Sequence, residues 1–552
     1  MKTRILGGMC AFLLYHTSFA QLVVQGSLDS QFRRYQAWGQ ELRQPPNAYF
    51  LSGRMVWRWG EKIKIPVTFS LTNQRVIVGV PSLQVPRRWA QSFNRLSFQP
   101  KWKDHQFYVG THALTFSPYT LAGHRAQGIG YVYRSSKSPF YGGIQGGQLL
   151  QRVLPDSLGV SRPAYARWGG SAKLGYQHAQ GFVEISHLSS SDVWQGDVWD
   201  RLIPEKNQAS SLSVQQKLAE SWRLNALYGR SVISRFGGGD LWEKQKARQA
   251  WKLEALYQAG AWEGGMAYAH TDPQFRTHGA YLINQDLDTY SGHGLWRQDW
   301  GEIRGETGVE QSTRQSQRLS RETRWVNRWH AQGQWESGWT ADVGWSNFTS
   351  IANLRPELLY LQALESWHFV DTLNFRQMNQ QWTSQVGYQV PTASKEISTT
   401  VSLQGQWQQG RDTQGEQAQE TRIFSSQASL SRANTARKSS WQASVQALQT
   451  VMGNRAEWMA GPQVHWKSPI GKDRWELMGQ VAQNQFWSEG QSTRQLWTAL
   501  LGCSARFGDQ HRLSLQGRWM HQKGLEWGQL SEQTITLSYQ YQWNLTLIPL
   551  KP

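Results

Sequence analysis

Residues 534–546 alternate between hydrogen-bonding and apolar side chains without a break. The run reads Thr-Ile-Thr-Leu-Ser-Tyr-Gln-Tyr-Gln-Trp-Asn-Leu-Thr. Side chains on a β-strand point to opposite faces with a period of two, so one face of this segment is apolar and aromatic while the other is polar and uncharged. About 9–11 tilted residues are enough for a strand to cross a bilayer. The segment therefore predicts a membrane-spanning β-strand.

The same alternation recurs along the chain, for example in residues 339–346, 382–390 and 397–407. In the last of these the polar face holds only Ser, Thr and Gln. Strands of soluble β-sandwiches are shorter, about 5–6 residues, and bury mainly aliphatic side chains. Segments of this kind from about residue 49 to residue 546 number roughly two dozen, and bacterial barrels have even strand numbers. We therefore predict an all-β fold, a transmembrane antiparallel β-barrel of roughly 20–26 strands.

The alternation also assigns side chains to faces. The apolar and aromatic positions are predicted to face lipid: Trp339, Val343, Trp345, Trp382, Tyr388, Tyr539, Tyr541 and Trp543. The polar positions are predicted to face the lumen: Arg324, Arg328, His330, Thr340, Asp342, Gln385, Gln540 and Gln542.

The amino terminus has the features of a signal peptide, predicted to span residues 1–20. Lys2 and Arg4 precede an apolar run, and Ser18-Phe19-Ala20 fits a cleavage site. Export of a barrel predicts localisation in the cell outer membrane. Residues 21–47 show no sustained period, which predicts a short periplasmic or lumen-inserted lead, with the barrel itself spanning residues 48–552.

The barrel is predicted to close through its last strand. Residues 532–547 should pair with residues 510–521 on one side and with a first strand near residues 49–59 on the other, because an open edge in lipid leaves backbone groups without hydrogen bonds.

Composition narrows the function classes. Beyond the amino terminus no stretch is apolar enough for a transmembrane helix, and the mean hydropathy is −0.60, so a helical membrane protein is excluded. The net charge is +19, but Lys and Arg are spread along the chain, and nucleic-acid binding needs clustered phosphate contacts. We expect no nucleic acid among the partners, which should be outer-membrane lipids, lipopolysaccharide and the outer-membrane assembly machinery. Cys503 alone would remain after signal cleavage, so neither a disulfide nor a thiolate metal cluster is expected, and no cofactor or metal site is predicted.

Residues 94–133 contain the least ordinary stretch. Phe98-Gln99-Pro100 and Trp102 precede the block Phe116-Ser117-Pro118-Tyr119-Thr120-Leu121-Ala122-Gly123-His124. This order resembles a block of large outer-membrane β-barrel proteins of Bacteroidota, mostly of unassigned function. The resemblance implies an outer-membrane barrel and membership of a larger envelope complex with other subunits; it implies no catalytic residue.

Pro118 cannot donate to a strand ladder, so the block must contain a turn or a bend. In one interpretation it folds into the lumen and narrows it, with Tyr119, His124 and Arg125 at the constriction. The simpler interpretation is a periplasmic turn followed by glycine-relieved strand curvature, and we favour it because glycine in strands commonly marks bends.

Catalysis has one weak candidate. His187 and Ser189 share a strand face, as in outer-membrane lipid hydrolases, but no acid lies in position to orient the histidine. We therefore predict that the chain is not an enzyme, and lipid hydrolysis is a minor alternative. The main hypothesis is a structural or translocation component of an envelope complex, its lumen open or closed by its own loops. The alternative is a porin-like channel for small polar or anionic solutes.

Overall fold

The computed structural model describes residues 22–39, 42, 44–60, 62–73, 95–153, 164–194, 202–238, 241–281, 283–312, 323–347, 378–412, 419–453, 455–471, 474–524 and 528–547. The predicted signal peptide, residues 1–20, lies outside these ranges. No helix in the described part of the chain is long and apolar enough to cross a membrane.

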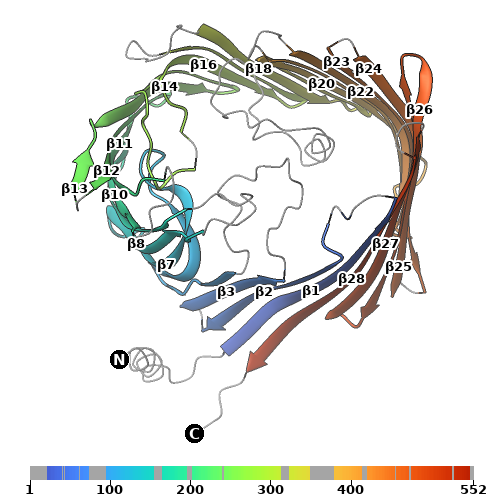
Figure 1. Ribbon diagram of the computed structural model, residues 1–552, viewed down its shortest axis with the longest axis horizontal. Helices are drawn as coiled ribbons and strands as arrows, with labels where there is room; N and C mark the ends of the chain where they lie inside the picture. The colour runs from blue at the N-terminus through green and yellow to red at the C-terminus, as the bar shows by residue number, and fades with distance from the viewer. Residues whose placement is uncertain are drawn as a thin grey trace.

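The described residues form one antiparallel sheet whose ends meet, so that the strands make a closed ring (Figure 1). The strands are β1 (Leu22–Trp38), β2 (Asn47–Trp59), β3 (Ile63–Thr72), β4 (Arg95–Phe98), β5 (Lys101–Trp102), β6 (His105–Thr115), β7 (Ala122–Arg134), β8 (Phe140–Leu150), β9 (Ala166–His178), β10 (Gly181–Val193), β11 (Glu205–Lys217), β12 (Trp222–Gly238), β13 (Leu241–Lys244), β14 (Arg248–Ala259), β15 (Trp262–Thr271), β16 (Leu287–Gln298), β17 (Gly301–Ser312), β18 (Thr323–Gln334), β19 (Trp339–Ser346), β20 (Met378–Val390), β21 (Ile397–Asp412), β22 (Gln419–Asn434), β23 (Ser439–Met452), β24 (Arg455–Ile470), β25 (Trp475–Ser488), β26 (Gln491–Phe507), β27 (His511–Gly524) and β28 (Gly528–Leu547).

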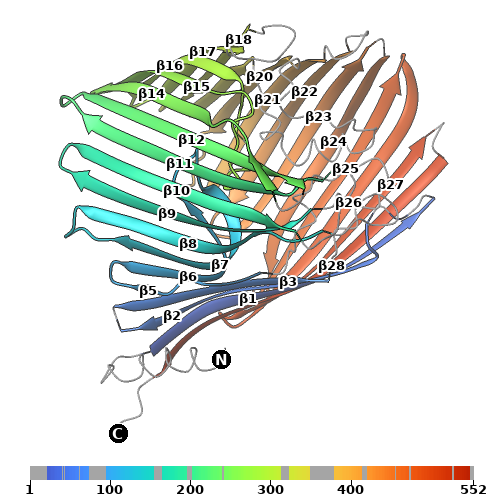
Figure 2. The ribbon, with the colours of Figure 1, turned by 60° about the vertical axis from the view of Figure 1, so that its left-hand side comes forward.

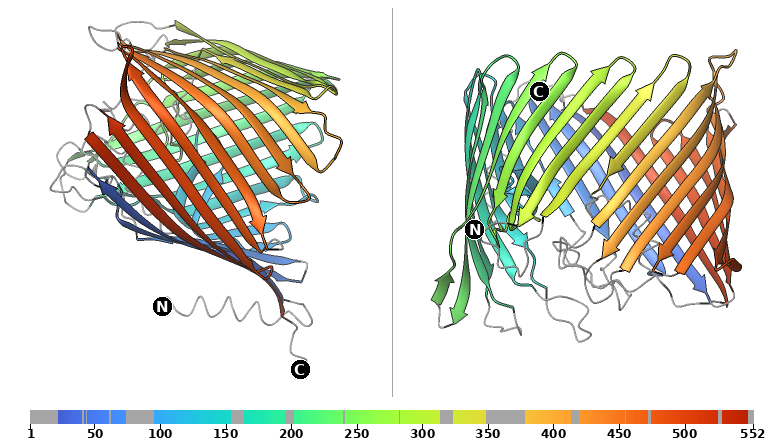
Figure 3. Two further views of the ribbon diagram at one scale, coloured as in Figure 1. Left: turned by 90° about the vertical axis from the view of Figure 1, so that its right-hand side faces the viewer. Right: turned by 90° about the horizontal axis from the view of Figure 1, so that it is seen from above.

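At two places in the ring, two successive strands occupy one position. β4 and β5 both lie between β3 and β6, interrupted where Pro100 cannot donate, and β13 and β14 both pair with β12. The result is a closed barrel of 26 strands, which confirms the predicted fold class. The strands are visibly tilted to the barrel axis (Figures 2 and 3).

The closing pair corrects the sequence analysis. β28 pairs with β27, as predicted, but its other neighbour is β1 rather than a strand near residues 49–59. Most of the predicted lead, residues 21–47, is therefore barrel wall, and the barrel does not begin at residue 48. The alternation of β1 is hidden in the sequence because Gly26, Ser30 and Arg34 interrupt its otherwise apolar outward face. At Gly26 a Cβ atom would lie 2.5 Å from the Trp543 ring. The indole of β28 fills the space that an apolar side chain of β1 would otherwise occupy.

The two ends of the barrel differ. At one end the strands join through tight turns, such as those at Gly260 (φ 55°) and Gly508 (φ 67°), where a left-handed backbone favours glycine. At the other end lie the longer connections, including residues 272–286 between β15 and β16. Short turns at one end and longer loops at the other are typical of outer-membrane barrels, in which the short turns face the periplasm.

Exposed tryptophans form a girdle near each end of the outer wall. At the short-turn end they include Trp57, Trp222, Trp262, Trp339, Trp441 and Trp475, and at the long-loop end they include Trp325, Trp382 and Trp458. Aromatic girdles at both interfaces, with an apolar band between them, are a feature of membrane barrels. The outer wall is thus built to contact lipid.

Candidate functional site

Two segments from the long-loop end fold back inside the ring (Figure 1). We call residues 116–121, between β6 and β7, the inner turn, and residues 272–286, between β15 and β16, the inner loop. Both lie against the inward faces of β10, β11 and β12. The favoured interpretation of the inner turn, a periplasmic turn outside the lumen, is therefore wrong.

The inner turn is held by its own backbone and by the wall behind it. The Phe116 and Ser117 amides donate to the Leu121 carbonyl at 2.8 and 3.2 Å. Thr120 and Leu121 have no exposed surface, and the Thr120 hydroxyl lies 2.7 Å from the Ser186 hydroxyl of β10. Pro118, which has no amide hydrogen, is exposed. The turn is thus tied to the wall on one side and open to the lumen on the other.

The inner loop fastens the turn in place. The Thr277 hydroxyl donates to the Thr120 carbonyl at 3.0 Å, and the Ala122 amide donates to the Gly279 carbonyl at 2.9 Å. Gly279 is required by this close approach, since a Cβ atom there would lie 2.3 Å from the Thr120 carbonyl oxygen. The two inner segments therefore form one unit.

Asn207 of β11 joins this unit to the barrel wall. Its side chain is fully buried and its amide nitrogen donates to the Ser231 hydroxyl at 2.8 Å, while its oxygen accepts from the His278 amide at 3.0 Å. The Ser231 hydroxyl in turn donates to the Arg276 carbonyl at 2.6 Å. Because each of these buried groups is paired, removing one leaves others without a hydrogen bond.

An ionic cluster borders this junction. Arg276 of the inner loop and Arg235 of β12 both pair with Glu205. His278 lies with Nδ1 2.9 Å from the Ser190 hydroxyl and Nε2 3.6 Å from Glu205. Burial lowers the pKa of His278 to about 4, although Glu205 opposes this shift, so the imidazole is neutral near pH 7.

The three residues predicted to form the constriction all contact the inner loop, but at separate points. Tyr119 packs edge-on to Phe275, with ring centroids 5.6 Å apart, and lies against Gly229 of β12. The His124 ring stacks on Tyr281 at 4.4 Å, and the Arg125 amide donates to the Tyr281 hydroxyl at 3.1 Å. Burial raises the pKa of Tyr119 above its ordinary value. A constriction at these residues stays a prediction.

The inward face can be followed around the ring, because residues directly opposite each other on antiparallel strands share a face. From Asn225 of β12 the register passes to Glu254 of β14 and on to Arg328 and His330 of β18. It continues through Asp342 of β19 to β28, where Gln540 lies opposite Asp29 of β1 and Gln542 opposite Ser27. Arg324 is paired in the backbone register with Glu310.

On β16 to β19 this inward face carries charges of both signs. His330 accepts from Arg304 at 3.3 Å through one ring nitrogen and lies 2.9 Å from the Asp342 carboxylate through the other. Arg297 pairs with Glu302 at 3.5 Å. A luminal pocket of about 680 Å³ is lined by these strands and includes Arg328, which has no ion-pair partner within 4.0 Å among the described residues.

Among the side chains that the structure describes, the inward face of β20 to β23 is uncharged. Gln385, Gln404, Gln427 and Gln446 lie directly opposite one another on successive strands. The uncharged Ser/Thr/Gln face of residues 397–407 predicted one strand of this surface. The pairing register of the structure shows that four neighbouring strands share it.

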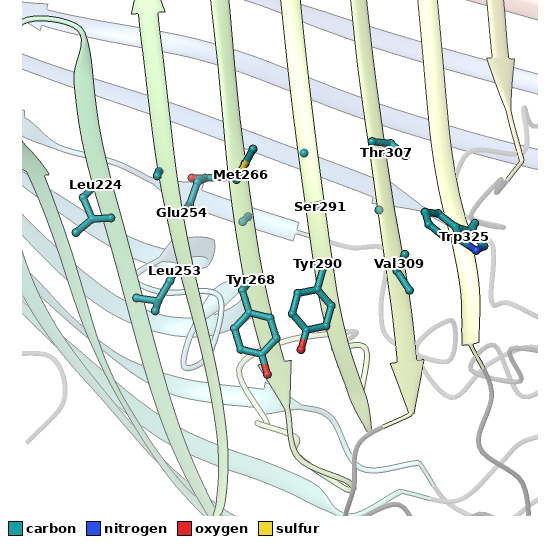
Figure 4. Close-up of a pocket in the computed structure, with 14 residues that line it drawn as sticks. Leu224, Leu253, Glu254, Met266, Tyr268, Tyr290, Ser291, Thr307, Val309 and Trp325 are labelled. Atoms are coloured by element: carbon teal, nitrogen blue, oxygen red, sulfur yellow. The ribbon is translucent and has the colours of Figure 1, made fainter.

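The outward face of β12 to β18 holds a shallow apolar groove of about 580 Å³. Leu253, Met266 and Val309 contribute side chains, and Tyr268 stacks on Tyr290 with ring centroids 4.6 Å apart (Figure 4). Met266 is 77% exposed, which fits a surface that contacts lipid rather than water.

The candidate catalytic pair lies on the outer wall. Ile185, which has the same parity as His187 on β10, is 58% exposed, and His187 Nδ1 lies 2.9 Å from the Ser210 hydroxyl of β11. Among the described residues, no group of three or more His, Cys, Asp or Glu side chains is placed to hold a metal ion.

No protein-family model matches this chain, and no curated protein matches it. Several solved structures are similar in architecture. The P pilus usher (PapC) translocation pore has 8% sequence identity and a TM-score of 0.38, with 94% of this chain and 99% of that chain covered. The copper transporter OprC has 8% identity and a TM-score of 0.37, covering 96% and 82%. OccAB2 of Acinetobacter baumannii has 9% identity and a TM-score of 0.31, covering 94% and 98%. At these identities the likeness concerns the barrel fold alone.

Proposed function

We propose that this protein is an outer-membrane conduit for polar solutes, narrowed by the inner turn and the inner loop. The observation that carries the proposal is the asymmetry of the inward face. The described inner segments are fastened to β10–β12, while the described inward side chains of β20–β23 are mostly hydrogen-bonding and carry no charge. A passage lined by polar groups favours hydrated solutes.

The outer-membrane location is supported by the outer wall. The two tryptophan girdles, the apolar band and the groove around Met266 provide the surface that lipid chains and lipopolysaccharide would contact. Insertion would depend on the outer-membrane assembly machinery, which commonly reads an aromatic last strand; β28 supplies Tyr539, Tyr541 and Trp543.

A role as a translocation component of an envelope complex rests on the resemblance of the block Phe116–His124. The same barrel geometry would also suit a channel that acts without other subunits. A translocation component and an independent channel would therefore differ in their protein partners and not in the structure of the conduit. Solute preference would follow from the lumen: Arg328, which has no ion-pair partner among the described residues, would favour anions if the passage is narrow beside it.

Single-channel recording in a planar bilayer tests the proposal. The intact barrel should conduct, but less than expected for 26 strands, because the inner segments occupy part of the lumen. Replacing residues 117–126 with a short Gly/Ser turn should raise conductance several-fold, with anion preference. The matched control replaces residues 435–438, the tight turn between β22 and β23, and should leave conductance unchanged.

Two results would contradict the proposal. If neither the intact barrel nor the 117–126 variant conducts, although both are folded and inserted, the protein is a closed scaffold. If the variant conducts as the intact barrel does, the inner turn does not narrow the passage, and the constriction at Tyr119, His124 and Arg125 is wrong.

A further inference from the structure

The inward face of β20–β23 presents an ordered array of amide side chains. Gln385 is opposite Gln404, Gln404 is opposite Gln427, and Gln427 is opposite Gln446. The row extends to β25, because the Gln446 amide donates to the Asn484 side-chain oxygen at 2.9 Å. Opposite residues on antiparallel strands are about 4.5–5.5 Å apart, so the amides follow one another at close and regular spacing.

Hydroxyl groups flank the amide row. On one side Ser402 lies opposite Ser429, which lies opposite Ser444, and the Ser402 and Ser429 hydroxyls are 2.7 Å apart. On the other side Thr383 lies opposite Gln406 and Gln406 opposite Ser425. We call these three rows the amide wall. They contain no charged side chain, whereas β16–β19 carry both signs on the same inward face.

The direction of the rows matters for a conduit. Each row runs across the strands, and the strands are tilted about 35–45° to the axis, so the rows climb obliquely along the passage. Two of the four glutamines, Gln385 and Gln404, are exposed and the other two are half-buried. A chain-like solute could therefore lie along several amides in succession.

We infer that the amide wall binds neutral polyhydroxylated chains, that is, oligosaccharides without charged groups. This inference rests on the proposed conduit and names its solute class. Each amide both donates and accepts hydrogen bonds, as does each hydroxyl, and the hydroxyl groups of a sugar have the same dual character. A charged solute finds no countercharge on this surface and loses hydration when it approaches, whereas a neutral one exchanges hydrogen bonds with water for equivalent ones.

Current recordings with a linear neutral glucan, maltoheptaose, test the inference. The sugar should interrupt the open-channel current in resolved events. The double variant Gln404→Leu with Gln427→Leu, which keeps side-chain bulk but removes both amides, should shorten the events about tenfold, the effect of losing roughly two neutral hydrogen bonds. Gln31→Leu on β1 removes an exposed inward-face amide from another part of the ring and should leave the events unchanged.

The design separates the two proposals. If no current is observed, the proposed conduit is contradicted, but the amide wall is not. In that case, equilibrium dialysis of labelled maltoheptaose against the detergent-solubilised barrel measures sugar binding without conduction. Equal sugar binding by the parent and the double variant would overturn the inference. So would an equal loss of binding of a sulfated oligosaccharide of similar length in the double variant, because it would show that the amide wall does not select neutral chains.

Discussion

The inward faces of β10–β12 and of β20–β23 are made from similar residue types but have different structural roles. Ser186, Asn207 and Ser231 on the first are buried and bonded to the inner turn and inner loop. Gln385 and Gln404 on the second are exposed to the lumen. The difference shows that a polar inward side chain can have either of two roles. Where a segment of the chain folds back over it, the side chain holds that segment in place; where no described segment covers it, the side chain lines the passage.

The largest expected effect tests the division of the barrel wall into an apolar outer face and a polar inward face. Val343→Arg on β19 and Val401→Arg on β21 should each cost about 2–4 kcal/mol if they lie near mid-bilayer, because both side chains are exposed on the apolar outer face. The inward Asp342→Arg should cost less. Unfolding of the barrel in lipid vesicles measures these free energies, and equal losses for Val343→Arg and Asp342→Arg would refute the assignment of faces.

A smaller effect should distinguish the inward faces. Asn207→Leu should lower the free energy of unfolding by about 1–3 kcal/mol and release the inner loop, because buried partners such as the His278 amide lose their acceptor. Gln404→Leu should be close to neutral, since its side chain is exposed. Protease cleavage within residues 272–286 reports release, and similar cleavage in both variants would show that the two surfaces do not differ.

The smallest effect is a pH dependence confined to the β10–β12 side. Because burial holds the pKa of His278 at about 4, below its ordinary value near 6.5, the docked loop favours the neutral imidazole. The stability that it contributes is present above pH 6.5 and is lost as the pH falls toward 4. Glu205, Arg276, Asp192 and Arg167 surround it, and Glu205 and Asp192 oppose the loss.

Cleavage of the inner loop should therefore increase between pH 6.5 and 4, and His278→Gln, which remains neutral, should remove this dependence. The same pH dependence in His278→Gln would assign it to another group. The amide wall has no titratable side chain, so maltoheptaose binding there should not follow this pH profile.

The sequence by itself determined the barrel, because each strand carries its own period of two and the lipid-facing positions must be apolar whatever the neighbours are. It also determined the last strand, whose alternation is unbroken over residues 534–546. The amide wall could have been anticipated in part, since residues 397–407 already show an uncharged polar face.

Only the tertiary structure decided the first strand and the inner segments. The alternation of β1 is interrupted at Gly26, whose missing side chain is replaced by Trp543 from the far end of the chain. The local sequence of the inner turn predicts only an ordinary turn around Pro118. It does not indicate that Thr120 will contact Ser186 and Thr277. The alternation of residues along a strand predicts which face each side chain lies on. Contacts between distant segments depend instead on complementary shape and on hydrogen bonds that form only when the ring has closed.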